Sequence, residues 1–131
     1  MKLRIHDGSL RLRLSCIDVD QLQETGICAE SLQFGTGSQL AYTLETSSQF
    51  TVMEAQYRQD RIRILLPLDI ARKWACSDQI SLSLDPAVGG GPSLLIEKDF
   101  RCLHSDERRP SDDADSFPNP LADDRGSVIL K

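Results

Sequence analysis

The chain has 131 residues, with 15 Lys and Arg against 20 Asp and Glu and a formal net charge of −5 at pH 7. This length is that of a single domain. Residues 1–104 carry 11 Lys and Arg against 13 Asp and Glu, and residues 105–131 carry 4 against 7. Nonspecific nucleic-acid binding requires clustered positive charge, which this distribution lacks. We therefore expect no nucleic-acid partner.

The sequence also argues against secretion and membrane insertion. Residues 1–14 alternate charged and apolar residues, unlike the continuous apolar stretch of a signal peptide, and no segment approaches the length of a membrane span. Four cysteines are scattered without a C-x-x-C pair, which predicts free, mostly buried thiols. They are Cys16, Cys28, Cys76 and Cys102. We expect a cytoplasmic protein with no membrane partner.

The first half of the chain predicts a hairpin, a helix and two further strands. Residues 1–14 form the hairpin, with a turn at Asp7-Gly8. Ser15 is suited to cap a helix over about residues 16–25, which Gly26 would end. The next two strands are predicted near residues 30–34 and 39–45, around a turn that contains two glycines.

The second half predicts the same order of elements. Pro67 suits the first turn of a helix, and Leu68, Ala71 and Trp74 recur at helical spacing behind it. Ser77-Asp78 would end this helix. Alternating apolar and polar residues predict the strands. These cover residues 50–57, 61–66, 79–85 and 93–97.

The two halves, residues 1–46 and 47–104, also match in sequence. Arg11–Leu14 aligns with Arg61–Ile64 at an offset of 50, which indicates an internal duplication, with repeated hydrophobic patterning as the alternative.

The predicted fold is a single, mainly antiparallel α+β domain over residues 1–104. Two ββαββ halves would form a curled sheet or a closed barrel of about eight strands, because closure removes unpaired edges. The two short helices would plug an open end or lie against one face. Residues 105–131 are rich in Asp, Ser and Pro, which predicts an acidic, largely disordered tail.

Two R-x-R strands offer a candidate anion site. Arg11, Arg13, Arg61 and Arg63 would lie on the polar faces of equivalent strands, where four guanidinium groups could bind phosphate or carboxylate bidentately. The alternative is that these arginines form ordinary cross-strand ion pairs with acids such as Glu45, Glu54 or Glu97.

The segment from Glu97 to His104 contains the other candidate chemistry. Cys102 and His104 would point the same way on an extended chain, which suits metal ligands, but no second ligand pair has recognisable spacing. A nucleophilic Cys102 with His104 as its base lacks an oxyanion-stabilising turn nearby. We predict no metal, no cofactor and no catalytic residue.

Three segments suggest a family. Met1–Ile5, Ser9–Leu14 and Glu97–Leu103 resemble a group of small uncharacterised bacterial proteins that share a domain of unknown function. The resemblance covers nearly the whole of residues 1–104. It implies a bacterial, cytosolic source and carries no activity or site residue.

The sequence leaves the function unknown and favours a noncatalytic binding or protein-interaction module. Its partner classes are another protein, a second copy of the chain, or a small anion. The alternative is a small enzyme or an anion-binding protein that uses Arg11, Arg13, Arg61 and Arg63. These two classes differ in one way that a structure reveals, which is whether the arginines converge.

Overall fold

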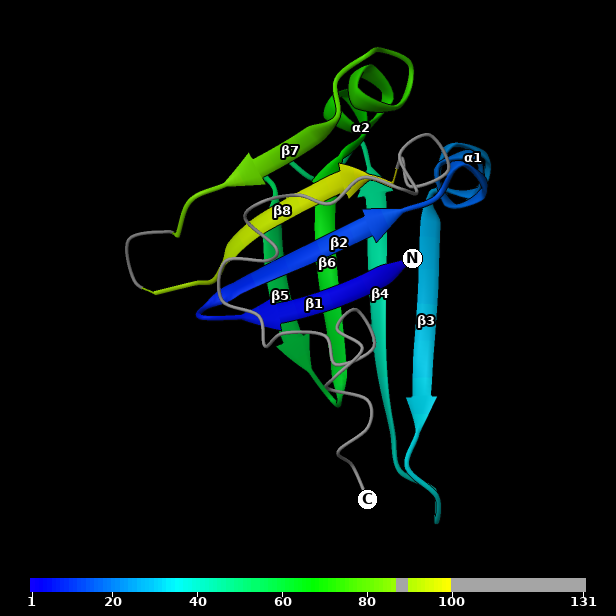
Figure 1. The fold of residues 1–131 in the computed structure, drawn as a ribbon, viewed down its shortest axis with the longest axis vertical. Coiled ribbons are helices and arrows are strands. Elements are labelled where there is room, and N and C mark those ends of the chain that lie inside the picture. Colours follow the sequence, from blue (N-terminus) through cyan, green and yellow to red (C-terminus); the bar gives the residue numbers. More distant parts are fainter. Residues whose placement is uncertain (87–89, 100–131) are drawn as a thin grey trace, which may run out of the picture. The chain divides into compact units, whose positions relative to one another are not determined.

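The structure, a computed structural model, describes residues 1–86 and 90–99, which belong to one compact unit, Met1–Asp99. Its eight strands form two four-stranded sheets (Figure 1). Sheet A has the order β1-β2-β8-β7, with β1 Lys2–His6, β2 Ser9–Leu14, β7 Ser81–Leu84 and β8 Ser93–Lys98. Sheet B has the order β3-β4-β6-β5, with β3 Ile27–Gln33, β4 Gln39–Ser47, β5 Glu54–Arg58 and β6 Arg61–Pro67.

The prediction of a closed barrel or one curled sheet was wrong. Each sheet is built from two antiparallel hairpins joined by a central parallel pair, β2·β8 in sheet A and β4·β6 in sheet B. The strands β1, β7, β3 and β5 therefore remain edges. Alternating apolar residues require only that one face of each strand be buried, and a sandwich satisfies this as well as a barrel does.

The two sheets face each other across one apolar core. Leu12 and Leu14 of β2 are buried in the same cluster as Ile62 and Ile64 of β6. Alternation along the strands then directs the polar residues between them to the outer face of each sheet. The largest buried side chain is Trp74, whose indole N–H donates to the Ile80 carbonyl at 3.0 Å.

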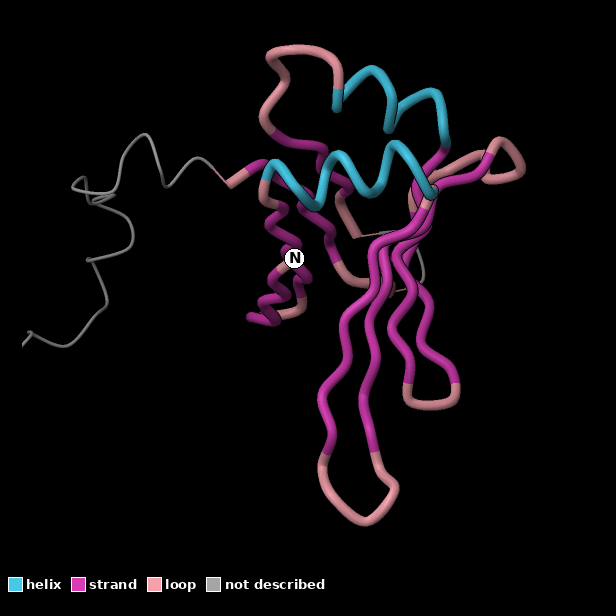
Figure 2. Tube along the Cα trace, turned by 90° about the vertical axis from the view of Figure 1, so that its right-hand side faces the viewer, coloured by secondary structure: helices cyan, strands magenta, loops and turns pink. Residues whose placement is uncertain are grey.

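The helices α1 (Cys16–Thr25) and α2 (Leu68–Ala75) follow β2 and β6 directly, and both lie at the same end of the sandwich (Figures 1 and 2). The predicted α1 boundaries are confirmed. Ser15 accepts a hydrogen bond from the Asp18 amide, and Gly26 ends the helix at a φ of 82°. An αL residue at this position is costly for side chains other than glycine.

Two strands begin three or more residues away from the predicted position. β3 begins at Ile27, three residues earlier than expected, and β5 begins at Glu54, four residues later. The second difference arises because the Phe50 amide donates to the Ser47 carbonyl at 3.2 Å and turns the chain. The apolar residues that follow this turn resemble a strand start in sequence alone.

The two halves share the element order and the register of the parallel pairs and of the β1–β2 and β5–β6 hairpins, whereas the register of β7·β8 differs by two residues from that of β3·β4. Ser9 pairs with Ser93 across β2·β8, and Arg61 pairs with Ala41 across β6·β4. Arg61 lies 52 positions after Ser9, and Ser93 lies 52 positions after Ala41. The two pairs are therefore equivalent at an offset of 52 residues. The predicted offset of 50 was therefore wrong by two residues, a slip that leaves every side chain on its original face.

This equivalence exchanges the two sheets. The β1–β2 hairpin of the first half joins β8–β7 of the second half in sheet A, and β5–β6 joins β4–β3 in sheet B. The offset of 52 also relates the two helices, because the buried Val19 and Leu22 of α1 correspond to the buried Ala71 and Trp74 of α2. A common ancestry of the halves stays a prediction.

Candidate functional site

An apolar hollow with a volume of about 290 Å³ opens between the β1–β2 and β5–β6 hairpins. Aliphatic and aromatic side chains dominate its lining. These are Ile5, Leu10, Ala55, Tyr57, Ile62 and Pro92. Such a volume accommodates one or two side chains and is slightly below the usual range for a drug-sized ligand.

The hollow lies where equivalent residues of the two halves meet. With the offset of 52, Ile5 corresponds to Tyr57 and Leu10 to Ile62, and all four line it. Ala55, which also lines the hollow, corresponds to Leu3 of the first half. The smaller alanine leaves space on the second-half side, so the hollow is a departure from the internal symmetry.

Two exposed side chains border the hollow. Ile5 is 63% exposed and Tyr57 is 67% exposed, although both line the cavity. Their hairpins end in two-residue turns, Asp7-Gly8 and Gln59-Asp60, in which all four residues have positive φ. Turns of this type match the twist of the strands, so they fix the direction of both hairpin tips.

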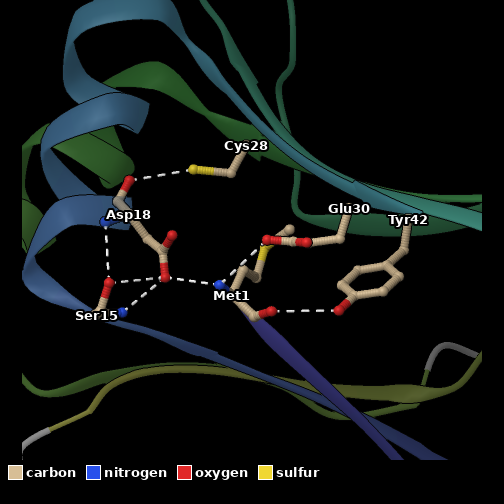
Figure 3. A network of polar contacts seen from close by, with 6 residues as sticks. All are labelled: Met1, Ser15, Asp18, Cys28, Glu30 and Tyr42. Atoms are coloured by element: carbon tan, nitrogen blue, oxygen red, sulfur yellow. Dashed lines mark hydrogen bonds and ion pairs between the residues drawn. The ribbon is translucent and has the colours of Figure 1, made fainter. Parts of the chain in front are cut away.

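A network around Met1 holds the start of β1 in place (Figure 3). The Met1 ammonium group contacts Asp18 Oδ2 at 2.7 Å and Glu30 Oε2 at 3.6 Å. The Tyr42 hydroxyl donates to the Met1 carbonyl at 3.2 Å. Because Glu30 and Tyr42 belong to sheet B and Asp18 to α1, this network ties sheet A to both.

Asp18 is the centre of this network. Its carboxylate also accepts hydrogen bonds from the Ser15 amide at 2.9 Å and the Ser15 hydroxyl at 3.0 Å. Burial by itself would raise the pKa of Asp18, but the hydrogen bonds from Met1 and Ser15 lower it overall. The carboxylate is therefore stabilised in its charged form.

Two neighbours of Asp18 have raised pKa values, because hydrogen bonds do not offset the effect of burial there. The Cys28 thiol donates to the Asp18 carbonyl at 3.1 Å, and its pKa is raised by burial and by the Asp18 charge. The pKa of Tyr42 is also raised, by burial and by the nearby Glu30 charge. Both groups are stabilised in their neutral, hydrogen-bond-donating forms.

The structure divides the four predicted anion-binding arginines between two faces. Arg11 and Arg13 lie on the outer face of sheet A, and Arg61 and Arg63 lie on the outer face of sheet B, because the residues alternating with them are buried. The two outer faces point in opposite directions. The two pairs therefore do not converge on one pocket, and anion binding by either pair stays a prediction.

Three of these arginines form the expected cross-strand ion pairs. Glu97 lies 2.9 Å from Arg13 and 3.8 Å from Arg11, and Glu45 lies 2.7 Å from Arg63. The hydrogen bonds between Arg63 and Glu45 lower the pKa of Glu45 and raise that of Arg63. Each of these contacts is partly exposed, so each contributes little to stability.

A second set of cations on sheet A was not among the predicted site residues. Lys2 lies directly opposite Arg13, and Arg4 lies directly opposite Arg11, with all four side chains on the outer face. The signal was present, because a two-residue turn at Asp7-Gly8 determines which residues of the hairpin are paired. Like charges in such positions repel.

The remaining candidates give no site in the described part of the chain. Cys102 and His104 lie outside it, and within it no three His, Cys, Asp or Glu side chains are arranged to hold a metal ion. Cys16, Cys28 and Cys76 are free as predicted, but Cys16 and Cys76 are exposed, so the expectation of mostly buried thiols fails for these two. Neither described helix has the length and apolarity needed to cross a bilayer.

These features define a mixed α+β protein with two four-stranded sheets and a small apolar hollow. The chain belongs to a family of unknown function, DUF7009, whose model matches residues 1–121. The resemblance to an uncharacterised family is thereby confirmed, while the bacterial source stays a prediction. No curated protein and no solved structure matches the chain.

Proposed function

We propose that this protein is a noncatalytic binding module whose apolar hollow receives apolar side chains of a partner protein. The observation that carries this proposal is the hollow itself, with Ile5 and Tyr57 exposed beside it. Small apolar pockets that take one aromatic or aliphatic anchor supply much of the binding energy in protein interfaces. The proposal includes a bacterial, cytoplasmic setting.

The rival proposal is a small enzyme or an anion-binding protein that gathers Arg11, Arg13, Arg61 and Arg63 in one pocket. It draws less support because the two pairs lie on opposite outer faces and three of the four already contact Glu45 or Glu97. A catalytic pocket also needs several convergent polar groups, and the lining of the hollow is mainly apolar.

A titration followed by two-dimensional NMR tests the proposal, with N-acetyl-tryptophanamide as the probe of a single apolar side chain. We expect the backbone amides of Gly8, Leu10 and Tyr57 to shift together, with saturation in the millimolar range that suits one anchor. The Ala55→Leu variant places at this position the residue that its first-half counterpart Leu3 carries. It should fill the hollow and abolish the shifts.

The matched control is Ala29→Leu, which makes the same change at an exposed position on the outer face of β3. This variant should bind the probe as the parent chain does. Equal probe binding by the Ala55→Leu variant, or shifts spread evenly over the molecule, would contradict the proposal.

A further inference from the structure

The strand β1 borders the hollow and has a strand on only one side. It is an edge of sheet A, and its five residues pair with β2 alone. In an antiparallel ladder the backbone groups of every second residue point away from the partner strand. In the described part of the chain, no hydrogen bond other than those of the β1–β2 ladder satisfies the backbone groups of residues 2–5. This edge can therefore accept another strand.

The outward positions of sheet A are strongly basic next to that edge. Lys2 and Arg4 on β1 face Arg13 and Arg11 on β2, so two cation–cation pairs follow one another along the hairpin. The outward positions of all four strands of sheet A contain one carboxylate, Glu97, which already contacts both β2 arginines. Lys2 and Arg4 form no ion pair in the described residues.

The inner face of sheet B continues past this edge. Figures 1 and 2 show strands of sheet B extending beyond β1 on the side away from the helices. The register of sheet B places Leu32 and Tyr57 on the inner face, each next to the last residue of its strand, and they are 56% and 67% exposed. An apolar surface thus lies beneath the space that a strand added to β1 would occupy.

We propose that the partner supplies an extended segment in which acidic and apolar residues alternate, and that this segment pairs with the free edge of β1. This inference rests on the proposed function and names its partner class. In a strand beside β1, alternate side chains lie on opposite faces. The acidic residues lie beside Lys2 and Arg4, and the apolar residues face Leu32, Ile5 and Tyr57.

The charges also disfavour the other occupants. A second copy paired through its own β1 would bring Lys2 and Arg4 close to the same cations, and like charges side by side oppose pairing. A nucleic acid would neutralise the cations, but it would leave the backbone groups of β1 and the apolar side chains of Leu32 and Tyr57 without partners. An acidic and apolar strand satisfies all three features.

Fluorescence anisotropy with labelled six-residue peptides and the full chain tests the inference. One peptide alternates Glu and Val, a second alternates Lys and Val, and a third alternates Glu and Ser. We expect the Glu-Val peptide to bind at least about tenfold more tightly than either of the others, with an affinity that falls as salt is added. Equal binding of the three peptides would overturn the inference.

A charge exchange supplies the matched variant. In a chain with Lys2→Glu and Arg4→Glu, the Glu-Val peptide should lose its affinity and the Lys-Val peptide should gain it by a similar factor. Gain of Lys-Val binding shows that the variant is folded, so a loss cannot be attributed to unfolding. A variant that still prefers the Glu-Val peptide would show that Lys2 and Arg4 do not select the partner.

A further measurement, made beside the probe titration of the hollow, separates this inference from the proposed function. Methylation of the peptide amides that face β1 should abolish binding while leaving all charges in place. If methylation has no effect, strand pairing is wrong, although the hollow can still bind its probe. If methylation abolishes binding but the Glu-Val and Lys-Val peptides bind equally well, strand pairing occurs without a charge preference. The inference then fails, and the proposed function stands.

Competition in the same assay and a sedimentation measurement test the other occupants. Displacement of the Glu-Val peptide by oligothymidine at a lower concentration than by unlabelled peptide would assign the surface to nucleic acid. Sedimentation equilibrium that shows a dimer dissociated by the peptide would assign it to a second copy. Either result would overturn the inference.

Discussion

Arg4 on β1 lies directly opposite Arg11 on β2, and both side chains point away from the core. The same relationship holds for Arg58 and Arg61 at the end of the β5–β6 hairpin. Two cations in this position repel each other and reduce the stability of the pair. Both hairpins therefore carry a small energetic cost, and at β1 we attribute it to partner binding.

Replacement of Arg4 by Glu should stabilise the protein by about 0.5 kcal/mol at low salt, because it turns a repulsive cross-strand pair into an attractive one. Arg58→Glu should give a similar gain and is the matched control. Urea unfolding measures both changes. Only Arg4→Glu should weaken binding of the Glu-Val peptide, and an equal loss in the Arg58→Glu variant would contradict the assignment of the β1 edge.

Asp18→Asn should reduce the free energy of unfolding at pH 7 by about 1.5 kcal/mol, because it removes a charged acceptor of three hydrogen bonds. The pKa of Asp18 is lowered in the folded state, so its contribution is complete above the unfolded pKa of about 4 and is lost as the pH falls through the folded value. The variant should lack this part of the acid sensitivity.

Urea unfolding between pH 2 and pH 7 measures that difference. The control is Asp20→Asn, which changes an exposed carboxylate on the same helix. The two stability curves of the parent and the Asp18→Asn variant should converge at the acid end. Parallel curves across the whole range would show that the Asp18 charge is not involved.

Trp74→Phe should destabilise the protein by about 2 kcal/mol. The indole is fully buried, and its loss leaves a cavity and removes the hydrogen bond to the Ile80 carbonyl. That carbonyl keeps a second donor, the Lys98 amide at 3.1 Å, which limits the cost. Tyr57→Phe, a change at an exposed aromatic residue, should alter stability by less than about 0.5 kcal/mol.

The three described cysteines should differ in reactivity. Cys16 and Cys76 are exposed, whereas Cys28 is 3% exposed and its pKa is raised by burial and the Asp18 charge. Because the thiolate is the reactive form, iodoacetamide should label Cys16 and Cys76 in the native protein and Cys28 only after unfolding. Peptide mass spectrometry reads the sites. If Cys28 in the native protein is labelled as fast as Cys16, the Cys28 side chain is not buried and the prediction is wrong.

The sequence predicted local structure correctly where that structure depends on residues close together in the chain. The α1 boundaries follow from Ser15 and Gly26, and the β1–β2 hairpin follows from Asp7-Gly8. It failed at β5, where the turn at Ser47 separates apolar residues from the strand that they resemble. There the deciding contact was a backbone hydrogen bond that residue type does not specify.

The hollow was not predicted from the sequence, and of the paired cations only Arg11 and Arg13 were predicted site residues. The paired cations of β1 and β2 could have been deduced from the hairpin register, but the hollow could not. Its lining comes from β1, β2, β5 and β6 and from Pro92, and its volume depends on a small Ala55 where the other half has Leu3. Cavities formed between distant segments are determined by packing, which the sequence pattern does not show.

The sequence by itself determined the order of strands and helices, the caps of α1 and the face that each strand buries, because these depend on local propensity and on alternation. Only the tertiary structure decided that β2 joins β8 and β4 joins β6, and that the halves correspond at 52 rather than 50 residues. Side chains two residues apart in a strand lie on the same face, so a shift of the alignment by two residues leaves the hydrophobic pattern unchanged. Long-range pairing and the loops between elements then select one arrangement, and with it the opposite faces on which the arginines lie.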